Sequence, residues 1–140
     1  MRMEIRVALA LLFLLAGLAG AAGEEKAKFA GTWEARAKGT VFLVLKVTAA
    51  DKISGTLNAG SIHMDDEGDL VEVGPVEDRE APIFFAHVDG DKLMFDFQDG
   101  DDDVLSFELK LTGEGAGELR IIDKEHPKLK GFAVKRVKAG

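Results

Sequence analysis

The sequence predicts an all-β protein in which eight to ten short antiparallel strands form a single up-and-down meander that closes into a barrel. Three observations predict this fold. Apolar and polar residues alternate over short runs, as expected of strands with one buried and one wet face. Clusters of Asp, Gly, Glu or Pro separate the runs at fairly even spacing. A meander of this length usually closes into a barrel, because closure leaves no sheet edge free. The alternative fold is a β-sandwich.

The N-terminus has the pattern of a secretory signal peptide. Two arginines precede the apolar run Val7–Ala22, and Ala19-Gly20-Ala21 supplies the small residues that a signal peptidase needs. The run is shorter than the roughly 20 residues of a membrane-spanning helix, although a retained anchor is the alternative. We therefore expect residues 1–21 to be cleaved, with no membrane insertion afterwards. The mature protein is expected outside the cytoplasm, either periplasmic or secreted.

The rest of the chain is expected to be one domain. Residues 22–28 are charged and short, which indicates a flexible lead-in, and residues 29–140 are assigned to the β-barrel. The chain contains no cysteine. Its stability must therefore come from burial and hydrogen bonds rather than from disulfides.

The first strands are expected at Thr32–Ala37, Val41–Thr48 and Ile53–Asn58. A Gly-Thr step opens the first strand, the run "VFLVLKVT" forms the second, and the turn "AADK" precedes the third. The second strand is apolar on both faces, with Phe42 and Val44 opposite its other apolar residues. In a single barrel one of these faces lies outside, so the strand predicts an exposed apolar stripe.

The middle of the chain is expected to form three shorter strands. A weaker strand at Ser61–Met64 and a strand at Leu70–Val73 flank the turn "DDEGD". A further strand at Ile83–Val88 ends at the turn "DGDK".

Four strands complete the meander. Lys92–Gln98 alternates strictly, and Val104–Thr112 repeats this alternation after the acidic turn "QDGDDD". Glu118–Asp123 follows "TGEGAG", and Gly131–Lys138 follows "DKEHPK". The barrel interior is expected either to be filled by apolar side chains or to hold one small apolar ligand. The residues expected to point inward are Leu43, Leu45, Phe85, Leu93, Phe95, Phe97, Leu105, Phe107, Leu109, Leu119, Ile121, Phe132 and Val134.

Gly31-Thr32-Trp33 carries the only tryptophan of the chain, and Arg136 shares the parity of the apolar residues in the last strand. These features resemble the lipocalin-like, calycin-type small β-barrel modules of secreted bacterial proteins of unknown function. In the lipocalin and calycin group this tryptophan closes the bottom of the barrel and an arginine of the last strand packs across the indole. The resemblance therefore implies that Trp33 and Arg136 close the barrel, a contact that contributes about 0.5 to 2 kcal/mol.

The predicted function is that of an exported, non-enzymatic binding module. The barrel interior is the expected site for a small hydrophobic ligand, which Phe85, Phe95, Phe97, Phe107 and Leu109 would contact. The alternative is a filled barrel that docks another envelope protein through the apolar outer stripe.

Other chemistry has weak support in the sequence. Asp99, Asp101 and Asp103 form a weak calcium candidate, but the loop lacks the spacing of an EF-hand, and the favoured interpretation is a solvated hairpin loop. The three histidines are scattered rather than spaced like zinc ligands. The chain has neither a G-x-S-x-G motif nor a cysteine, so we expect no enzyme, metal or cofactor. Its net charge of −7 disfavours nucleic acid as a partner.

Overall fold

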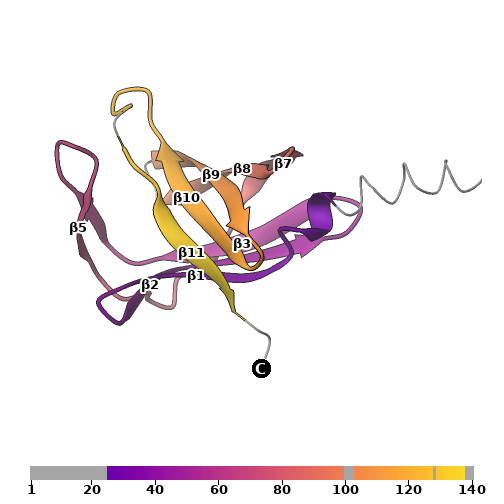
Figure 1. The fold of residues 1–140 in the computed structure, drawn as a ribbon, viewed down its shortest axis with the longest axis horizontal. Helices are drawn as coiled ribbons and strands as arrows, with labels where there is room; N and C mark the ends of the chain where they lie inside the picture. The colour runs from indigo at the N-terminus through magenta and orange to yellow at the C-terminus, as the bar shows by residue number, and fades with distance from the viewer. Residues whose placement is uncertain (1–24, 100–102, 128, 138–140) are drawn as a thin grey trace, which may run out of the picture.

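The computed structural model describes residues 25–99, 103–127 and 129–137, so the predicted signal peptide lies outside the described residues. Nine strands form one antiparallel sheet that curls into a nearly closed barrel, as predicted, and two more strands pair beside it (Figure 1). In chain order the strands are β1 (Gly31–Ala37), β2 (Thr40–Ala49), β3 (Ile53–Ala59), β4 (Ile62–Met64), β5 (Leu70–Val73), β6 (Ala81–Pro82), β7 (Phe84–Asp89), β8 (Lys92–Asp99), β9 (Asp103–Gly113), β10 (Ala116–Ile122) and β11 (Phe132–Val137).

The order of the strands around the barrel is β6-β3-β2-β1-β11-β10-β9-β8-β7. The first and last strands are neighbours, with Trp33 opposite Arg136. The sheet is therefore continuous where the two ends of the meander meet, and its two free edges lie in the middle of the sequence, at β3 with β6 and at β7. One continuous curled sheet excludes the β-sandwich alternative.

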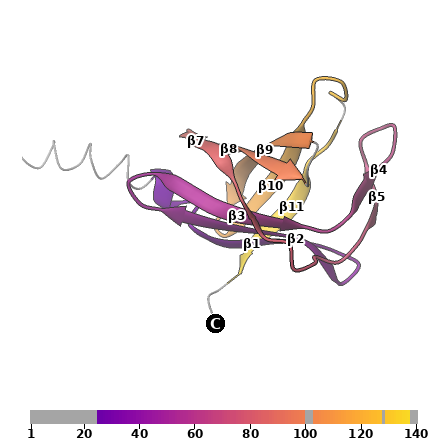
Figure 2. The same ribbon diagram turned by 180° about the vertical axis from the view of Figure 1, so that it is seen from behind.

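We call the junction between β3 and β7 the seam. β6 pairs with Thr56 and Leu57 of β3, and the N–H of Ile83 donates to the carbonyl of Gly55 at 3.0 Å. The next residue, Phe84, already pairs with Asp96 of β8. Between Ile83 and Phe84 the chain thus changes its pairing partner from β3 to β8. Figure 2 shows the chain rising from the layer of β3 to β7. The sequence predicted one strand here, not two.

β4 and β5 form a separate two-stranded hairpin that projects from the barrel (Figure 1). Two glycines stand at its base. The N–H of Gly74 donates to the carbonyl of Ser61 at 2.8 Å, and a Cβ on Gly60 would lie 2.2 Å from the carbonyl oxygen of Gly74. Only glycine allows the two chains to approach this closely, so these residues fix where the hairpin leaves the barrel.

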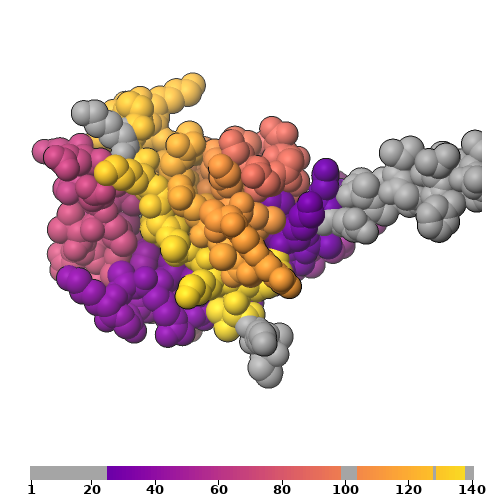
Figure 3. Space-filling view, in the orientation of Figure 1, coloured from indigo at the N-terminus to yellow at the C-terminus, as the bar shows by residue number. Residues whose placement is uncertain are grey.

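The barrel interior is filled by side chains. Most of the predicted inward residues are buried, Leu105 and Ile121 are partly buried, and the rings of Phe95 and Phe107 stack at 5.3 Å between centroids. The buried apolar residues are Phe29, Trp33, Ala35, Phe42, Leu43, Leu45, Val47, Leu57, Ile83, Leu93, Phe95, Phe97, Phe107, Leu109, Leu119, Phe132 and Val134. Figure 3 shows the side chains of β10 and β11 forming a closed surface over one face of this core.

The predicted apolar stripe is wrong at Phe42, which is 1% exposed. Ala35 pairs with Leu43 and Arg36 with Val41, so Phe42 is an extra residue on β2 and forms a β-bulge. A bulge interrupts strand alternation, and both Phe42 and Leu43 are consequently buried. The Phe42 ring lies 5.1 Å from the Phe132 ring in an edge-to-face arrangement.

The predicted inward position of Phe85 is also wrong. Phe84 pairs with Asp96 and His87 with Met94, so β7 carries one residue more than β8 between these pairs. Phe85 lies in this second bulge with a φ of 51°, and it is 77% exposed. The bulge rotates the side chain out of the alternation that would have placed it in the core.

Candidate functional site

The end of the barrel that holds Trp33 is closed. The Trp33 indole is fully buried, and its Nε1–H donates to the carbonyl of Phe29 at 2.9 Å. The Arg136 guanidinium lies 4.7 Å from the centre of the indole ring, which is the contact that the resemblance to lipocalin-like barrels implies. The guanidinium also donates to the carbonyl of Lys28. Gly31 passes beneath this arginine with a φ of +127°, where a Cβ would lie 3.3 Å from Arg136 Cδ.

A helical turn completes the closed end. Residues 25–27, which the sequence assigned to a flexible lead-in, form this turn, and the N–H of Phe29 donates to the carbonyl of Lys26 at 3.1 Å. The turn brings the buried Phe29 ring onto the bottom of the core. Short connections join β2 to β3, β7 to β8 and β9 to β10 at this end. Within the described residues the closed end therefore has no long loops between which a ligand could enter.

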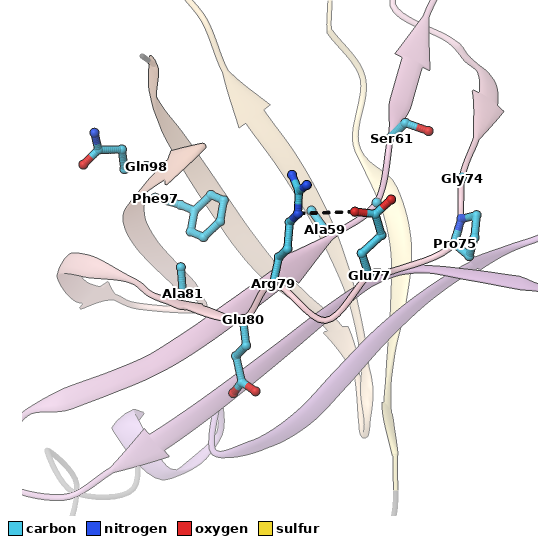
Figure 4. Close-up of a pocket in the computed structure, with 11 residues that line it drawn as sticks. Ala59, Ser61, Gly74, Pro75, Glu77, Arg79, Glu80, Ala81, Phe97 and Gln98 are labelled. Atoms are coloured by element: carbon cyan, nitrogen blue, oxygen red, sulfur yellow. Dashed lines mark ion pairs between the residues drawn. The ribbon is translucent and has the colours of Figure 1, made fainter. Parts of the chain in front are cut away.

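The opposite end carries the long connections and a cleft of about 630 Å³. The β4–β5 hairpin, the segment 74–80 and the loop between β10 and β11 all leave the barrel here. We call this hollow the open-end cleft (Figure 4), and its lining residues are Ala59, Gly60, Ser61, Gly74, Pro75, Glu77, Arg79, Glu80, Ala81, Phe97 and Gln98.

The open-end cleft combines one aromatic ring with one ion pair. Phe97 is 6% exposed, and its ring points toward the space beside Arg79 in Figure 4. Arg79 Nε lies 3.3 Å from Glu77 Oε2, and both side chains are exposed. An exposed pair of this kind contributes about 0 to 1 kcal/mol, so a carboxylate or phosphate of a ligand can replace Glu77 at little cost.

Glu80 points away from the other side chains of the cleft in Figure 4. Its carboxylate accepts a hydrogen bond from Thr56 Oγ1 and lies 3.5 Å from Lys46 Nζ. The Thr56 hydrogen bond, followed by the charge of Lys46, lowers the pKa of Glu80 below the ordinary glutamate value. Glu80 thus fastens the segment 74–80 to the outer face of β2 and β3.

The structure does not gather the predicted ligand-binding residues in one cavity. Phe95, Phe107 and Leu109 are packed in the core, Phe97 reaches the open-end cleft, and Phe85 lies on the surface elsewhere. Sequence reasoning missed Glu77 and Arg79. Their only signal was the composition of "GPVEDRE", a charged stretch after Gly-Pro without strand alternation.

The acidic loop that the sequence offered as a calcium candidate lies only partly within the described residues. Asp101 lies outside the described residues, and Asp99 and Asp103 are paired in the backbone at the ends of β8 and β9, which leaves the calcium prediction untested. Elsewhere in the described chain two clusters could hold a cation, namely Asp65, Glu67 and Asp69, and Asp123, Glu125 and His126.

Both clusters border a second cleft of about 390 Å³ and hold loops together. Asp65 Oδ1 accepts from the N–H groups of Glu67 and Asp69, each at 2.9 Å. Lys130 Nζ lies 2.9 Å from Asp69 Oδ1, and His126 Nδ1 lies 2.9 Å from Asp123 Oδ2. The hydrogen bond with Asp123 raises the pKa of His126, and the same bond lowers the pKa of Asp123.

In the described part of the chain no helix has the length or hydropathy of a membrane-spanning segment. Comparison of the chain with models of protein families, with curated proteins and with solved structures finds no match.

Proposed function

We propose that the protein is an exported, non-enzymatic binding module of the lipocalin-like type, and that it binds a small amphipathic molecule in the open-end cleft. The signal-peptide pattern of residues 1–21 supports export. The nearly closed barrel, with Trp33 and Arg136 at its closed end, is compatible with a lipocalin-like fold.

The packing favours the open-end cleft over the barrel interior. Phe95 of β8 stacks on its neighbour Phe107 of β9 in the core, and Leu93, Leu109 and Leu119 have no exposed surface. Interiors packed in this way hold few voids larger than a water molecule. A hydrophobic ligand would have to displace these side chains, whereas the cleft already lies within the range of about 300 to 1,000 Å³ typical of ligand pockets.

The single observation that carries the proposal is the presence of Phe97 and Arg79 in one cleft. An apolar chain or ring of the ligand would lie against Phe97, and a carboxylate would accept from the guanidinium of Arg79. A few placed polar groups around an apolar contact are the usual means of orienting a small ligand. The ligand class is therefore a monocarboxylate with an apolar tail.

Dodecanoate is a suitable probe, with dodecanol as the uncharged comparison. Calorimetric titration should show dodecanoate binding that weakens at least about tenfold in Arg79→Gln, because a charge-assisted hydrogen bond contributes about 1.5 to 3 kcal/mol. Arg36→Gln is the matched control, since Arg36 is also an exposed arginine paired with a nearby glutamate, at 3.1 Å. Its affinity should be unchanged.

Amide chemical shifts locate the bound probe. Dodecanoate should move the signals of Ser61, Gly74 and Gln98 in the open-end cleft and leave those of the closed end in place. Equal affinity in Arg79→Gln and in the unmodified protein would overturn the proposal, as would shifts confined to the core strands.

A further inference from the structure

A third cleft, of about 550 Å³, lies on the seam toward the closed end of the barrel. Residues of β7, the start of β3 and the N-terminal turn form it, and it shares no lining residue with the open-end cleft. We call it the seam cleft, and its lining residues are Glu25, Lys26, Asp51, Lys52, Ile53, Phe85, Ala86, His87 and Val88.

Two sheet edges border the seam cleft. β6 and Ile83 pair with β3 from Gly55 to Leu57, and no described strand pairs with Ile53 on that side. β7 pairs with β8 and with no other described strand. A free sheet edge presents unpaired N–H and C=O groups and is a template for another strand.

The backbone conformation of Phe85 at the seam cleft is unfavourable for a residue with a side chain. A φ of 51° is uncommon for a bulky residue, and left-handed backbone costs roughly 1 to 2 kcal/mol outside glycine. The other non-glycine residue with positive φ in the described chain is Lys38, which lies in the tight β1–β2 turn where such a φ is required. Phe85 occupies no such turn.

The same backbone conformation presents the ring to solvent. Phe85 is 77% exposed and touches Phe84 edge-to-face, with ring centroids 5.5 Å apart. His87 Nδ1 lies 3.3 Å from the carbonyl oxygen of Phe85, so a local contact supports the bulge. A strained residue with an exposed aromatic ring beside a free sheet edge is a combination typical of recognition sites.

We infer that the free edge of β7 docks an extended, cationic peptide segment of a partner protein, which adds to the sheet as a strand and places an apolar side chain against Phe85. Strand addition takes its affinity from main-chain hydrogen bonds and its specificity from alternate side chains. In a strand every second side chain points to the same face, so apolar residues would meet Phe85 and the intervening residues would face solvent and the rim.

The charges around the seam cleft select the occupant. Glu25, Lys26, Asp51 and Lys52 line it, and Asp89 and Asp91 are exposed at the end of β7 and in the turn that follows, so carboxylates outnumber lysines around it. Lys26 Nζ already donates to the backbone carbonyl of Asp51 at 3.0 Å. The rim therefore favours lysine and arginine on the incoming strand, whereas a second copy of this chain, with a net charge of −7, would be repelled.

A short peptide in which lysine alternates with valine, with one phenylalanine at its centre, tests the inference. It should bind with a dissociation constant in the micromolar range and slow hydrogen exchange at amides of Phe85 to Asp89. Phe85→Ser should weaken binding at least about tenfold, as expected when an aromatic anchor is lost. Val104→Ser, at another exposed apolar strand position, is the matched control and should bind normally.

Two altered peptides separate the components of binding. Alternate N-methylation removes half of the main-chain donors and should abolish binding if the peptide adds as a strand. Replacing its lysines with glutamates should weaken binding strongly. Equal binding of the N-methylated peptide, or unchanged binding by Phe85→Ser with a native circular dichroism spectrum, would overturn the inference.

Sedimentation of the protein alone tests whether a second copy of the chain, rather than a partner peptide, covers β7. A dimer that Phe85→Ser dissociates would show that a second copy covers β7, and would also overturn the inference. Dodecanoate binding should be the same in Phe85→Ser as in the unmodified protein, because the two clefts share no residue.

Discussion

The β-bulges of β2 and β7 each add one residue to a strand, but one bulge buries its phenylalanine and the other exposes it. In β2 the extra residue, Phe42, is 1% exposed and packs against Phe132. In β7 the bulge residue, Phe85, is 77% exposed and touches only its neighbour among the described aromatic contacts. Strand alternation predicts the reverse for both rings. A bulge therefore uncouples the direction of a side chain from its place in the sequence.

The two bulges also differ in backbone cost. Phe85 has a positive φ, whereas Phe42 is not among the described residues with one. The β2 bulge thus buries a large ring without left-handed strain, and the β7 bulge accepts strain without burying its ring. The bulge of β2 therefore contributes to the stability of the barrel. The bulge of β7 instead exposes the Phe85 ring, which is the ring that the proposed peptide would contact.

The largest expected effect is that of Phe42→Ala. Removal of a buried aromatic ring costs about 3 to 5 kcal/mol through lost burial and the cavity left behind. Urea denaturation followed by the fluorescence of Trp33, the only tryptophan, measures the loss. Val104→Ala, at an exposed strand position, should change the free energy of unfolding by less than about 0.5 kcal/mol. A cost below 1 kcal/mol for Phe42→Ala would remove the contrast between the bulges.

A smaller effect on the free energy of unfolding is expected at Phe85, where one substitution should be more stable than another. Phe85→Gly should be about 1 kcal/mol more stable than Phe85→Ala, because glycine accepts positive φ and alanine keeps the Cβ that causes the strain. Both variants remove the same exposed ring, so the difference between them reports the backbone alone. Equal stabilities in urea denaturation would mean that the β7 bulge stores no strain.

The smallest effect is expected at Glu80, which fastens the segment that leads into β6 and β7. The pKa of Glu80 is lowered in the folded protein, so its contribution is present above the unfolded pKa of about 4.3 and is lost as the pH falls through the folded value. Glu80→Gln should therefore be slightly less stable than the unmodified protein at neutral pH, and the difference should vanish well below pH 4.

Hydrogen exchange sharpens this test. The amide of Ile83, which donates to Gly55, should exchange faster in Glu80→Gln at neutral pH if Glu80 holds the seam. A stability difference that persists unchanged at low pH would assign it to packing rather than to the charge.

The sequence predicted what depends on local, regular patterns. Alternation located the barrel strands, and turn residues located the hairpins. The parity of Arg136 placed it on the face of Phe132 and Val134, and the resemblance to lipocalin-like barrels paired it with Trp33. Phe42 and Phe85 were misplaced for one shared reason, since neither bulge is marked by a glycine and alternation carries no sign of an extra residue. The site residues Glu77 and Arg79 lie on a segment without periodicity, which only tertiary contacts position.

The pairing of β1 with β11 has a consequence for how the barrel folds. It joins parts of the chain that are distant in sequence, since Lys28 and Arg136, which meet at the closed end, are 108 positions apart. Contacts of such separation require the closure of a long loop and slow folding. A circular permutant that begins at β7 and links β11 to β1 would turn this contact into a local hairpin, and the nine strands of the barrel would then follow one another in the chain in the order in which they pair. It should fold faster into the same barrel.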